Sequence, residues 1–139
     1  MRIFLLRNYG EVKGMSRILM IDDEQLIRSL IVEVLTLDGH EVDQAENGDI
    51  GLKLVELHPY DLVITDIIMP EMDGIGVIMS LKEKHPQIKT IVLTGGSLIN
   101  DKDYLINVSR LMKVDLVIPK PFVVDDLRNA VKELLQKQS

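Results

Sequence analysis

Acidic side chains stand at the ends of predicted strands in this sequence, together with a lysine. The run Asp22-Asp23-Glu24 follows one apolar strand, and Asp66 ends a second. Thr94 ends a third strand, and Lys120 follows a fourth within Ile118-Pro119-Lys120-Pro121. Because the carboxyl ends of parallel strands meet at one edge of a sheet, we expect these side chains to share one crevice.

These residues have the chemistry of a metal site that carries a nucleophile. Two carboxylates about 4 Å apart repel by about 4 kcal/mol at an effective dielectric of about 20, so a cation must compensate. Three carboxylates and one lysine sum to about −2, and their hard oxygen atoms suit Mg2+. With Mg2+ bound, Asp66 is placed to attack phosphorus and form an aspartyl phosphate. Thr94 and Lys120 would then stabilise charge on the phosphoryl group.

The elements that position these residues follow from the apolar pattern. Short segments rich in Val and Ile alternate with longer segments of helical period, which indicates βαβ units and a parallel sheet. We predict strands at residues 17–21, 41–44, 61–66, 90–94 and 116–118. The predicted helices follow them: one that ends at Gly39, one from Asn47-Gly48 to Pro59, and three at about 75–84, 101–112 and 125–136.

Local signals mark the ends and faces of these helices. Gly39 is a C-cap signal and Asp125 an N-cap signal. Asp22 is followed three residues later by Gln25, a capping-box pattern, so a capping role stands beside metal binding. Asp66 has no such role, because no helix begins directly after it. The first helix has one predicted apolar face, made of Leu26, Ile27, Leu30, Ile31, Val34 and Leu35.

Five βα units predict an α/β fold, (βα)5, with a doubly wound, five-stranded parallel sheet. Residues 15–139 form one predicted domain. Residues 1–14 precede the first strand and fit none of the repeats, so we treat them as an N-terminal extension, either ordered or disordered. Met15 is an alternative start residue.

Composition narrows the function classes. The chain has 139 residues, with 16 Lys and Arg against 22 Asp and Glu, and a net charge of −6. An acidic surface repels phosphate backbones and anionic lipids, so we expect neither nucleic acid nor a membrane as the main partner. The absence of cysteine excludes disulfides, thiolate zinc sites and a cysteine nucleophile. No export signal or membrane span is visible, so a cytoplasmic protein is the default expectation.

Solvated side chains near helix ends are expected for His40, His58 and His85.

Four short segments at the strand ends form an ordered pattern. They are Asp22-Asp23, residues 66–74 (DIIMPEMDG), Thr94-Gly95 and Lys120-Pro121-Phe122. Together they resemble the receiver domain of two-component response regulators, although each alone is a weak signal. The resemblance covers about residues 16–137, which makes residues 15–139 a receiver domain. It implies a flavodoxin-like fold with strand order 2-1-3-4-5.

The resemblance also implies a role for each matched residue. The metal ligands it implies are Asp22, Asp23, Asp66 and the backbone carbonyl of Ile68. Asp66 is in addition the phosphoacceptor, Thr94 is the switch hydroxyl, and Lys120 binds the phosphoryl group. The peptide bond between Lys120 and Pro121 is expected to be cis.

The sequence departs from the family pattern in its second half. Val117 occupies a second switch position that usually carries Tyr or Phe, and a valine has no ring whose rotation could report phosphorylation. Lys113-Val114 replaces the usual Gly-Ala, and the span 94–120 is longer than usual. Ile68 and Gly96 flank the path of the hydrolytic water in receivers. Neither offers a polar side chain to orient it, which predicts slow dephosphorylation.

These observations favour a phosphoacceptor receiver in a phosphorelay. A sensor histidine kinase or phosphotransfer protein would supply the phosphoryl group to Asp66, and the modified protein, a monomer or weak homodimer, would bind a downstream protein. The domain would catalyse its own Mg2+-dependent phosphorylation without being a dedicated enzyme. The alternative is a binding module of the same fold that does not depend on phosphorylation. A nucleotide or flavin binder is disfavoured, because no Gly-rich loop follows the first strand. A phosphatase is disfavoured by the lack of a second Asp two residues after Asp66.

Overall fold

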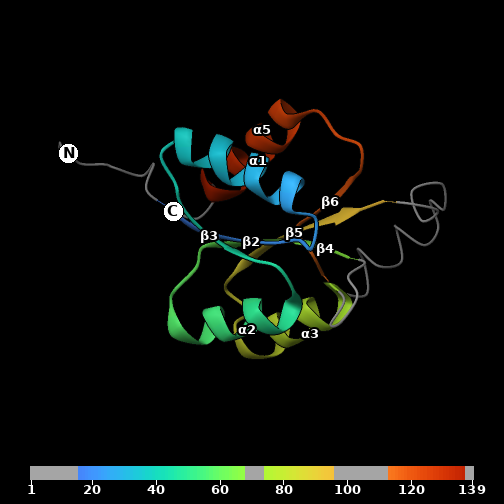
Figure 1. Cartoon of the computed structure of the whole chain (residues 1–139). Helices are drawn as coiled ribbons and strands as arrows, with labels where there is room; N and C mark the ends of the chain where they lie inside the picture. Colours follow the sequence, from blue (N-terminus) through green and yellow to red (C-terminus); the bar gives the residue numbers. More distant parts are fainter. Residues whose placement is uncertain (1–15, 68–73, 96–112, 137–139) are drawn as a thin grey trace.

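The part of the chain that the structure describes has three layers, with a parallel sheet between helices on both of its faces (Figure 1). The computed structural model describes residues 16–67, 74–95 and 113–136. Helices α1 and α5 cover one face of the sheet, and α2 and α3 cover the other. In chain order the elements are β2 (Arg17–Ile21), α1 (Gln25–Leu37), β3 (Glu41–Ala45), α2 (Gly48–Leu57), β4 (Leu62–Asp66), α3 (Gly74–Lys84), β5 (Lys89–Thr94), β6 (Leu116–Pro119) and α5 (Val124–Gln136).

The strand order places the two acidic strand ends next to each other. Within the described ranges the sheet has five strands in the order β3-β2-β4-β5-β6, and each neighbouring pair is parallel. Counted along the chain this is 2-1-3-4-5, so the predicted doubly wound fold is confirmed. Strand β2 lies between β3 and β4, with Ile21 opposite Thr65. The connections change direction at β2, and ligands bind at this kind of switch point in open α/β sheets.

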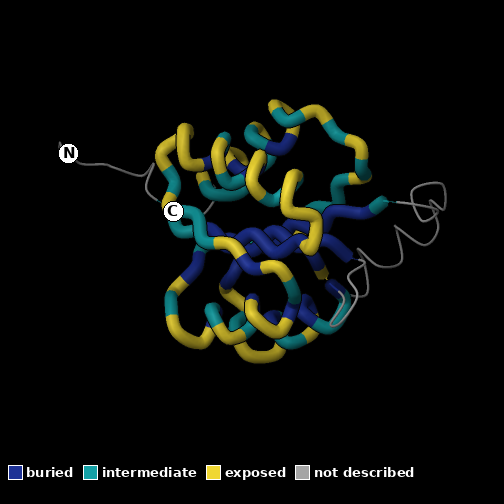
Figure 2. The backbone as a smooth tube through the Cα atoms, in the orientation of Figure 1, coloured by how far each residue is buried: buried dark blue, intermediate teal, exposed yellow. Residues whose placement is uncertain are grey.

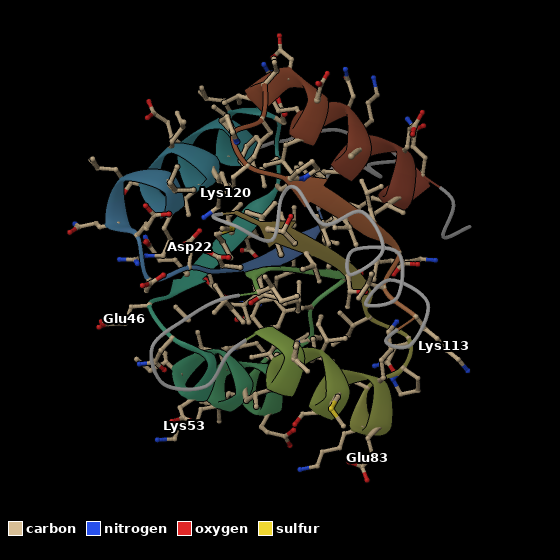
Figure 3. The ribbon with its side chains drawn as sticks, turned by 90° about the vertical axis from the view of Figure 1, so that its right-hand side faces the viewer. Asp22, Glu46, Lys53, Glu83, Lys113 and Lys120 are labelled. Atoms are coloured by element: carbon tan, nitrogen blue, oxygen red, sulfur yellow. The ribbon has the colours of Figure 1, made fainter. Side chains whose placement is uncertain are left out.

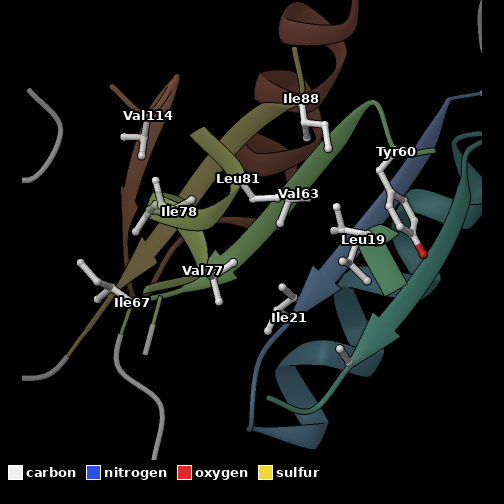
Figure 4. Close-up of a cluster of buried hydrophobic side chains, with 13 residues drawn as sticks. Leu19, Ile21, Tyr60, Val63, Ile67, Val77, Ile78, Leu81, Ile88 and Val114 are labelled. Atoms are coloured by element: carbon white, nitrogen blue, oxygen red, sulfur yellow. The ribbon is translucent and has the colours of Figure 1, made fainter. Parts of the chain in front are cut away.

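Alternate residues of the central strands enter two cores on opposite faces of the sheet. Strands β2, β4 and β5 are almost wholly buried (Figure 2), because helices cover both faces. One core lies on the side of α2 and α3 and includes Leu19, Val63 and Ile78 (Figure 4). The other lies on the side of α1 and α5 and includes Ile18 and Ile64. This two-sided burial fixes the strand register and therefore the position of each strand end.

Two helix ends lie within one or two residues of the positions that the sequence predicts. The Asn47 side chain caps α2 and accepts a hydrogen bond from the backbone N–H of Ile50 at 2.8 Å. Helix α1 ends at Leu37, and Gly39 directly follows the C-cap residue Asp38 with a φ of 98°. Glycine adopts this left-handed conformation without the strain that a Cβ would cause.

The two predicted aspartate caps are wrong. The N-cap of α1 is Glu24, and Asp22 lies two residues before it. The Asp22 carboxylate instead accepts a hydrogen bond from the backbone N–H of Glu24 at 2.8 Å. Helix α5 begins at Val124, so Asp125 lies in the first turn, where it pairs with Arg128 at 3.0 Å. A carboxylate in the first turn still interacts favourably with the helix dipole.

The predicted apolar face of α1 is only partly buried. Ile31 and Leu35 are fully buried against the sheet, whereas Leu26 is 86% exposed and Leu30 is 42% exposed. Residues four apart share a stripe of a helix, so Leu26 and Leu30 form a second stripe beside the buried one. The predicted face therefore contains a buried stripe and an exposed apolar stripe.

His40 differs from the solvated histidine that the sequence predicts. Its side chain is partly buried, and its Nδ1 atom has no hydrogen-bond partner among the described residues. Burial lowers the pKa of the His40 imidazole, although the carboxylates of Asp38 and Asp61 act to raise it. His85, in contrast, pairs with Glu56 at 2.9 Å between Nε2 and Oε2.

Burial of His40 predicts that stability depends on pH. The folded state favours the neutral imidazole, so the unfolded state takes up a proton first as the pH falls below about 6.5. The free energy of unfolding should be highest above this pH and fall as the pH drops toward 5. Urea unfolding at pH 8 and pH 5.5 measures the difference, which should be smaller in His40→Asn. An equal pH dependence in His40→Asn would contradict this assignment.

Several sequence predictions fall on residues outside the described ranges. These are the extension 1–14, the fourth predicted helix at about 101–112, Ile68 and Gly96. Among the helices of the described ranges, none combines the length and the apolar character that a bilayer crossing requires.

Candidate functional site

Three carboxylates meet where β2 and β4 end. Asp22 directly follows β2, Asp23 comes next, and Asp66 is the last residue of β4. One carboxylate oxygen from each residue lies within 4.8 Å of the others. Asp22 is fully buried and Asp66 is 6% exposed, whereas Asp23 is exposed. The predicted acidic site is therefore present, with one open side at Asp23.

Lys120 reaches into this cluster from the end of β6. Its Nζ donates to Asp66 Oδ2 at 2.8 Å and to Asp22 Oδ2 at 3.2 Å, and Figure 3 shows Lys120 and Asp22 on the same side of the molecule. The backbone N–H of Lys120 donates to the carbonyl of Thr94, which holds β6 to the end of β5. The Lys120–Pro121 bond is cis, as the resemblance implies. Lys120 is thus held beside the two buried carboxylates.

Glu24 is a partner of Lys120 that the sequence did not assign. Its Oε1 lies 3.0 Å from Lys120 Nζ, and its side chain is 60% exposed. The acidic run at residues 22–24 was the available signal, but the run alone does not tell which of its carboxylates contacts a lysine 96 residues away.

The pKa values of Asp22 and Lys120 are both raised in this site. Burial raises the pKa of the Asp22 carboxyl, although the Glu24 N–H and the Lys120 ammonium lower it. Burial lowers the pKa of Lys120, but its hydrogen bonds to Asp66 and Glu24 outweigh this effect and raise the pKa above its usual value. The ammonium is therefore firmly protonated, and the cluster still lacks positive charge.

The donor set fits a hard divalent cation. Carboxylate oxygens are the ligands that Mg2+ prefers, and it is usually held by a few of them together with several waters. Asp22, Asp23 and Asp66 supply such oxygens within 4.8 Å of one another. The exposed side at Asp23 leaves room for waters and for a phosphoryl donor.

Thr94 lies at the end of β5, beside the strand that carries Asp66. It is fully buried, and its hydroxyl has no hydrogen-bond partner among the described residues. A buried hydroxyl without a hydrogen-bond partner carries a desolvation cost. Val117 pairs with Val92 in the β5–β6 ladder and packs against the core on the side of α2 and α3.

Replacement of Thr94 by valine should stabilise the unphosphorylated protein. Valine has the same shape, and it removes the unpartnered hydroxyl, so Thr94→Val should raise the free energy of unfolding by about 1 kcal/mol. Urea unfolding measures this change. The control is Thr90→Val, because the buried Thr90 hydroxyl contacts Asp115 at 3.3 Å and its loss should destabilise the protein. A loss of stability in Thr94→Val would show that its hydroxyl has a partner in the folded state.

Gly74 brings the start of α3 directly onto the backbone of Asp66. A Cβ at this position would lie 2.2 Å from the Asp66 carbonyl oxygen and 2.7 Å from the Ile67 Cα. The Gly74 N–H donates to the Ile67 carbonyl at 2.9 Å, and the Ile67 N–H donates to the Leu93 carbonyl at 2.9 Å. The position of Asp66 therefore depends on the absence of a side chain at Gly74.

Comparison with known proteins identifies the family. Residues 18–132 match the family described as response regulator receiver domain. The chain belongs to this family. Its members are the phosphoacceptors of two-component signal transduction, and receiver domains in general are not dedicated enzymes.

Relatives and solved structures agree with the family assignment. The chain is 33% identical over 123 residues to sporulation initiation phosphotransferase F of Bacillus subtilis, covering 88% of this chain and 96% of that protein. The response regulator TrrA of Thermotoga maritima, solved in complex with Mg2+ and BeF, is 39% identical with a TM-score of 0.75, covering 86% and 99% of the two chains. A CheY-like receiver domain protein of Methanospirillum hungatei is 31% identical with a TM-score of 0.79, covering 89% and 96%.

Other receivers of this family are parts of longer proteins. The chain spans only 13%, 48% and 26% of three longer relatives to which it is 32% to 35% identical. The family thus includes both receivers of about this length and receivers joined to further domains.

Proposed function

We propose that this receiver accepts a phosphoryl group on Asp66 from a histidine kinase or a phosphotransfer protein, and that the modification switches its binding to a downstream protein. One observation carries the proposal: Lys120 Nζ contacts Asp66 Oδ2 at 2.8 Å inside the acidic cluster. A lysine so placed neutralises charge at the point where a phosphoryl group joins the carboxylate.

The metal in this proposal is Mg2+. The side chains of Asp22, Asp23 and Asp66 would hold it, and the backbone carbonyl of Ile68 is the further ligand that the family resemblance implies. When bound, Mg2+ supplies positive charge to the phosphoryl oxygens and orients them. The donor set supports this assignment, as does the solved complex of TrrA with Mg2+ and BeF.

The chemical step needs no general base. A carboxylate oxygen of Asp66 attacks the phosphorus of a phosphohistidine, and the new O–P bond forms as the P–N bond breaks. The imidazole leaves with the electron pair of the broken bond and takes a proton from solvent. Lys120 stays hydrogen-bonded to the reacting carboxylate and then to the phosphoryl oxygens, so the domain promotes its own phosphorylation.

The switch in this proposal centres on Thr94. A phosphoryl oxygen on Asp66 gives the buried Thr94 hydroxyl the acceptor that it lacks in the described structure. The hydrogen bond from the Lys120 N–H to the Thr94 carbonyl would pass a shift of Thr94 on to the end of β6. Val117 has no ring to rotate, so the change would be carried by Thr94 and by the Lys120 backbone that is hydrogen-bonded to it. Ile68 is apolar and Gly96 has no side chain, so neither residue can orient a hydrolytic water. This supports the slow dephosphorylation that the sequence predicts.

The phosphodonor would dock on the apolar surface beside Asp66. A groove of about 530 Å³ is lined by residues that include Ile27, Leu30, Phe122 and Asp66. Leu26, 86% exposed on the first turn of α1, adds apolar surface on the same helix. Such a surface suits a helix of a kinase or phosphotransfer protein, which would present its phosphohistidine to the acidic cluster. A cytoplasmic location and a monomer or weak homodimer are parts of the same proposal.

Acetyl phosphate with Mg2+ tests the proposal without a partner protein. We expect intact-mass spectrometry to show one added phosphoryl group on the wild type and on Asp49→Asn, which removes an exposed carboxylate in the first turn of α2. Asp66→Asn should remain unmodified, and so should the wild type in EDTA. An unmodified wild type, or equal labelling of Asp66→Asn, would contradict the proposal and favour a binding module that does not depend on phosphorylation.

A further inference from the structure

The peptide group between Asp22 and Asp23 has a partner outside the acidic cluster. Arg28 Nη1 donates to the backbone carbonyl of Asp22 at 2.6 Å. The same guanidinium donates from Nε to Gln44 Oε1 at 2.9 Å. Arg28 lies one turn into α1 and Gln44 lies on β3, so the contact ties the acidic turn to both neighbouring elements.

The other bonds of Asp22 show why this contact matters. The Asp22 N–H donates to the Ala45 carbonyl at 3.1 Å, and the two carboxylate oxygens accept from the Glu24 N–H and from Lys120. These contacts orient Asp22 itself. The Asp22 carbonyl belongs to the peptide plane that leads to Asp23. Among the described residues, Arg28 is the one that the hydrogen bonds place directly on this carbonyl.

We infer that Arg28 is a positioning residue for the metal site, which it serves by fixing the peptide between Asp22 and Asp23. This inference rests on the proposed function, because it assumes that these carboxylates hold Mg2+. The Asp23 side chain is exposed, so core packing does not orient it. Its direction follows from the peptide plane that Arg28 holds. Gln44 in turn holds the guanidinium in the donating orientation.

The charge of Arg28 and its positioning role predict opposite changes in Mg2+ affinity when Arg28 is removed. Arg28 carries a positive charge near the cluster and repels a divalent cation, so its removal should tighten Mg2+ binding if charge dominates. If orientation dominates, its removal should weaken binding, because residues that orient metal ligands commonly contribute 10-fold or more to metal affinity. The two accounts therefore differ in direction.

Titration calorimetry with MgCl2 on the full chain tests the inference. We expect the Kd for Mg2+ to rise about 10-fold in Arg28→Ala and by less in Gln44→Ala. The double variant should be no weaker than Arg28→Ala, because both act through one contact. Arg28→Lys keeps the charge and one donor, so its Kd should lie between wild type and Arg28→Ala. Arg128→Ala is the matched control, since it removes the same charge from an ion pair with Asp38 at the other end of α1.

The outcomes separate the inference from the proposed function. An unchanged or lower Kd in Arg28→Ala, with the wild type binding Mg2+, overturns the positioning role and leaves the proposed function standing. A wild type that binds no Mg2+ overturns both. Urea unfolding in EDTA reports whether each variant is folded. If Arg28→Ala is not folded, Gln44→Ala decides, because Gln44 is exposed and does not touch the carboxylates.

Discussion

Replacement of Lys120 by methionine is expected to separate metal binding from phosphorylation. Lys120 contacts Asp66, Asp22 and Glu24 within 3.2 Å, and 15% of its side chain is exposed. Its removal deletes a charge that repels Mg2+, so Mg2+ should bind about 10-fold more tightly. Phosphorylation by acetyl phosphate should nevertheless slow by about 100-fold or more, because the cation at the phosphoryl oxygens is lost.

The same substitution should lower stability when no metal is present. Removing one partner of a buried ion pair leaves the other charge without compensation, which costs about 3 kcal/mol in typical cases. Urea unfolding in EDTA and in Mg2+ measures this cost and its recovery by the metal. Lys53→Met is the matched control, since Lys53 is exposed on α2 and lies away from Lys120 in Figure 3. Wild-type phosphorylation rates in Lys120→Met would refute the role given to Lys120.

Replacement of Gly74 by alanine is expected to disturb Asp66, the proposed phosphoacceptor, directly. The added Cβ would lie 2.2 Å from the Asp66 carbonyl oxygen, and backbone atoms cannot move aside as a side chain can. Helix α3 must shift, which should lower the free energy of unfolding by about 3 kcal/mol. Phosphorylation should also fall, because Asp66 moves relative to Lys120.

Gly51 provides the comparison for Gly74. A Cβ at Gly51 would lie 2.4 Å from Cδ1 of Ile21, which is the end of a flexible side chain. Gly51→Ala should therefore cost about 1 kcal/mol and leave phosphorylation unchanged. Urea unfolding and acetyl phosphate labelling of both variants test the contrast. Equal losses of unfolding free energy and of labelling in the two variants would mean that α3 adjusts without moving Asp66.

The sequence was sufficient to predict the strands and the meeting of their ends. Period and composition locate β2, β4 and β5, and the parallel order then brings Asp22, Asp66 and Thr94 to one edge. The type of each residue supplied the chemistry, since a carboxylate at the end of a buried strand needs a cation. These predictions depend on local pattern and on general rules of parallel sheets, which the chain obeys.

The remaining details depend on contacts that local pattern does not contain. Glu24 pairs with Lys120, 96 residues away, and whether it does so depends on how β6 and α1 approach each other. Leu26 has the helical spacing of a core residue, but spacing does not decide which of two adjacent stripes faces the sheet. The Asp22 capping-box pattern was outweighed by the end of β2, which places the helix start two residues later. Arg28 is a further case, because its partners are a backbone carbonyl and a residue of β3.

We propose above all that Asp66, the acidic cluster and Lys120 form a working phosphoacceptor site. Addition of Mg2+ and beryllofluoride, a mimic of the phosphoryl group, tests this site most directly, with thermal unfolding and NMR spectroscopy as the two measurements. We expect a stabilisation of the wild type that requires Mg2+, and chemical-shift changes at Thr94 and Lys120. Asp66→Asn should show neither. The same unfolding temperature for the wild type with and without the mimic would contradict the claim.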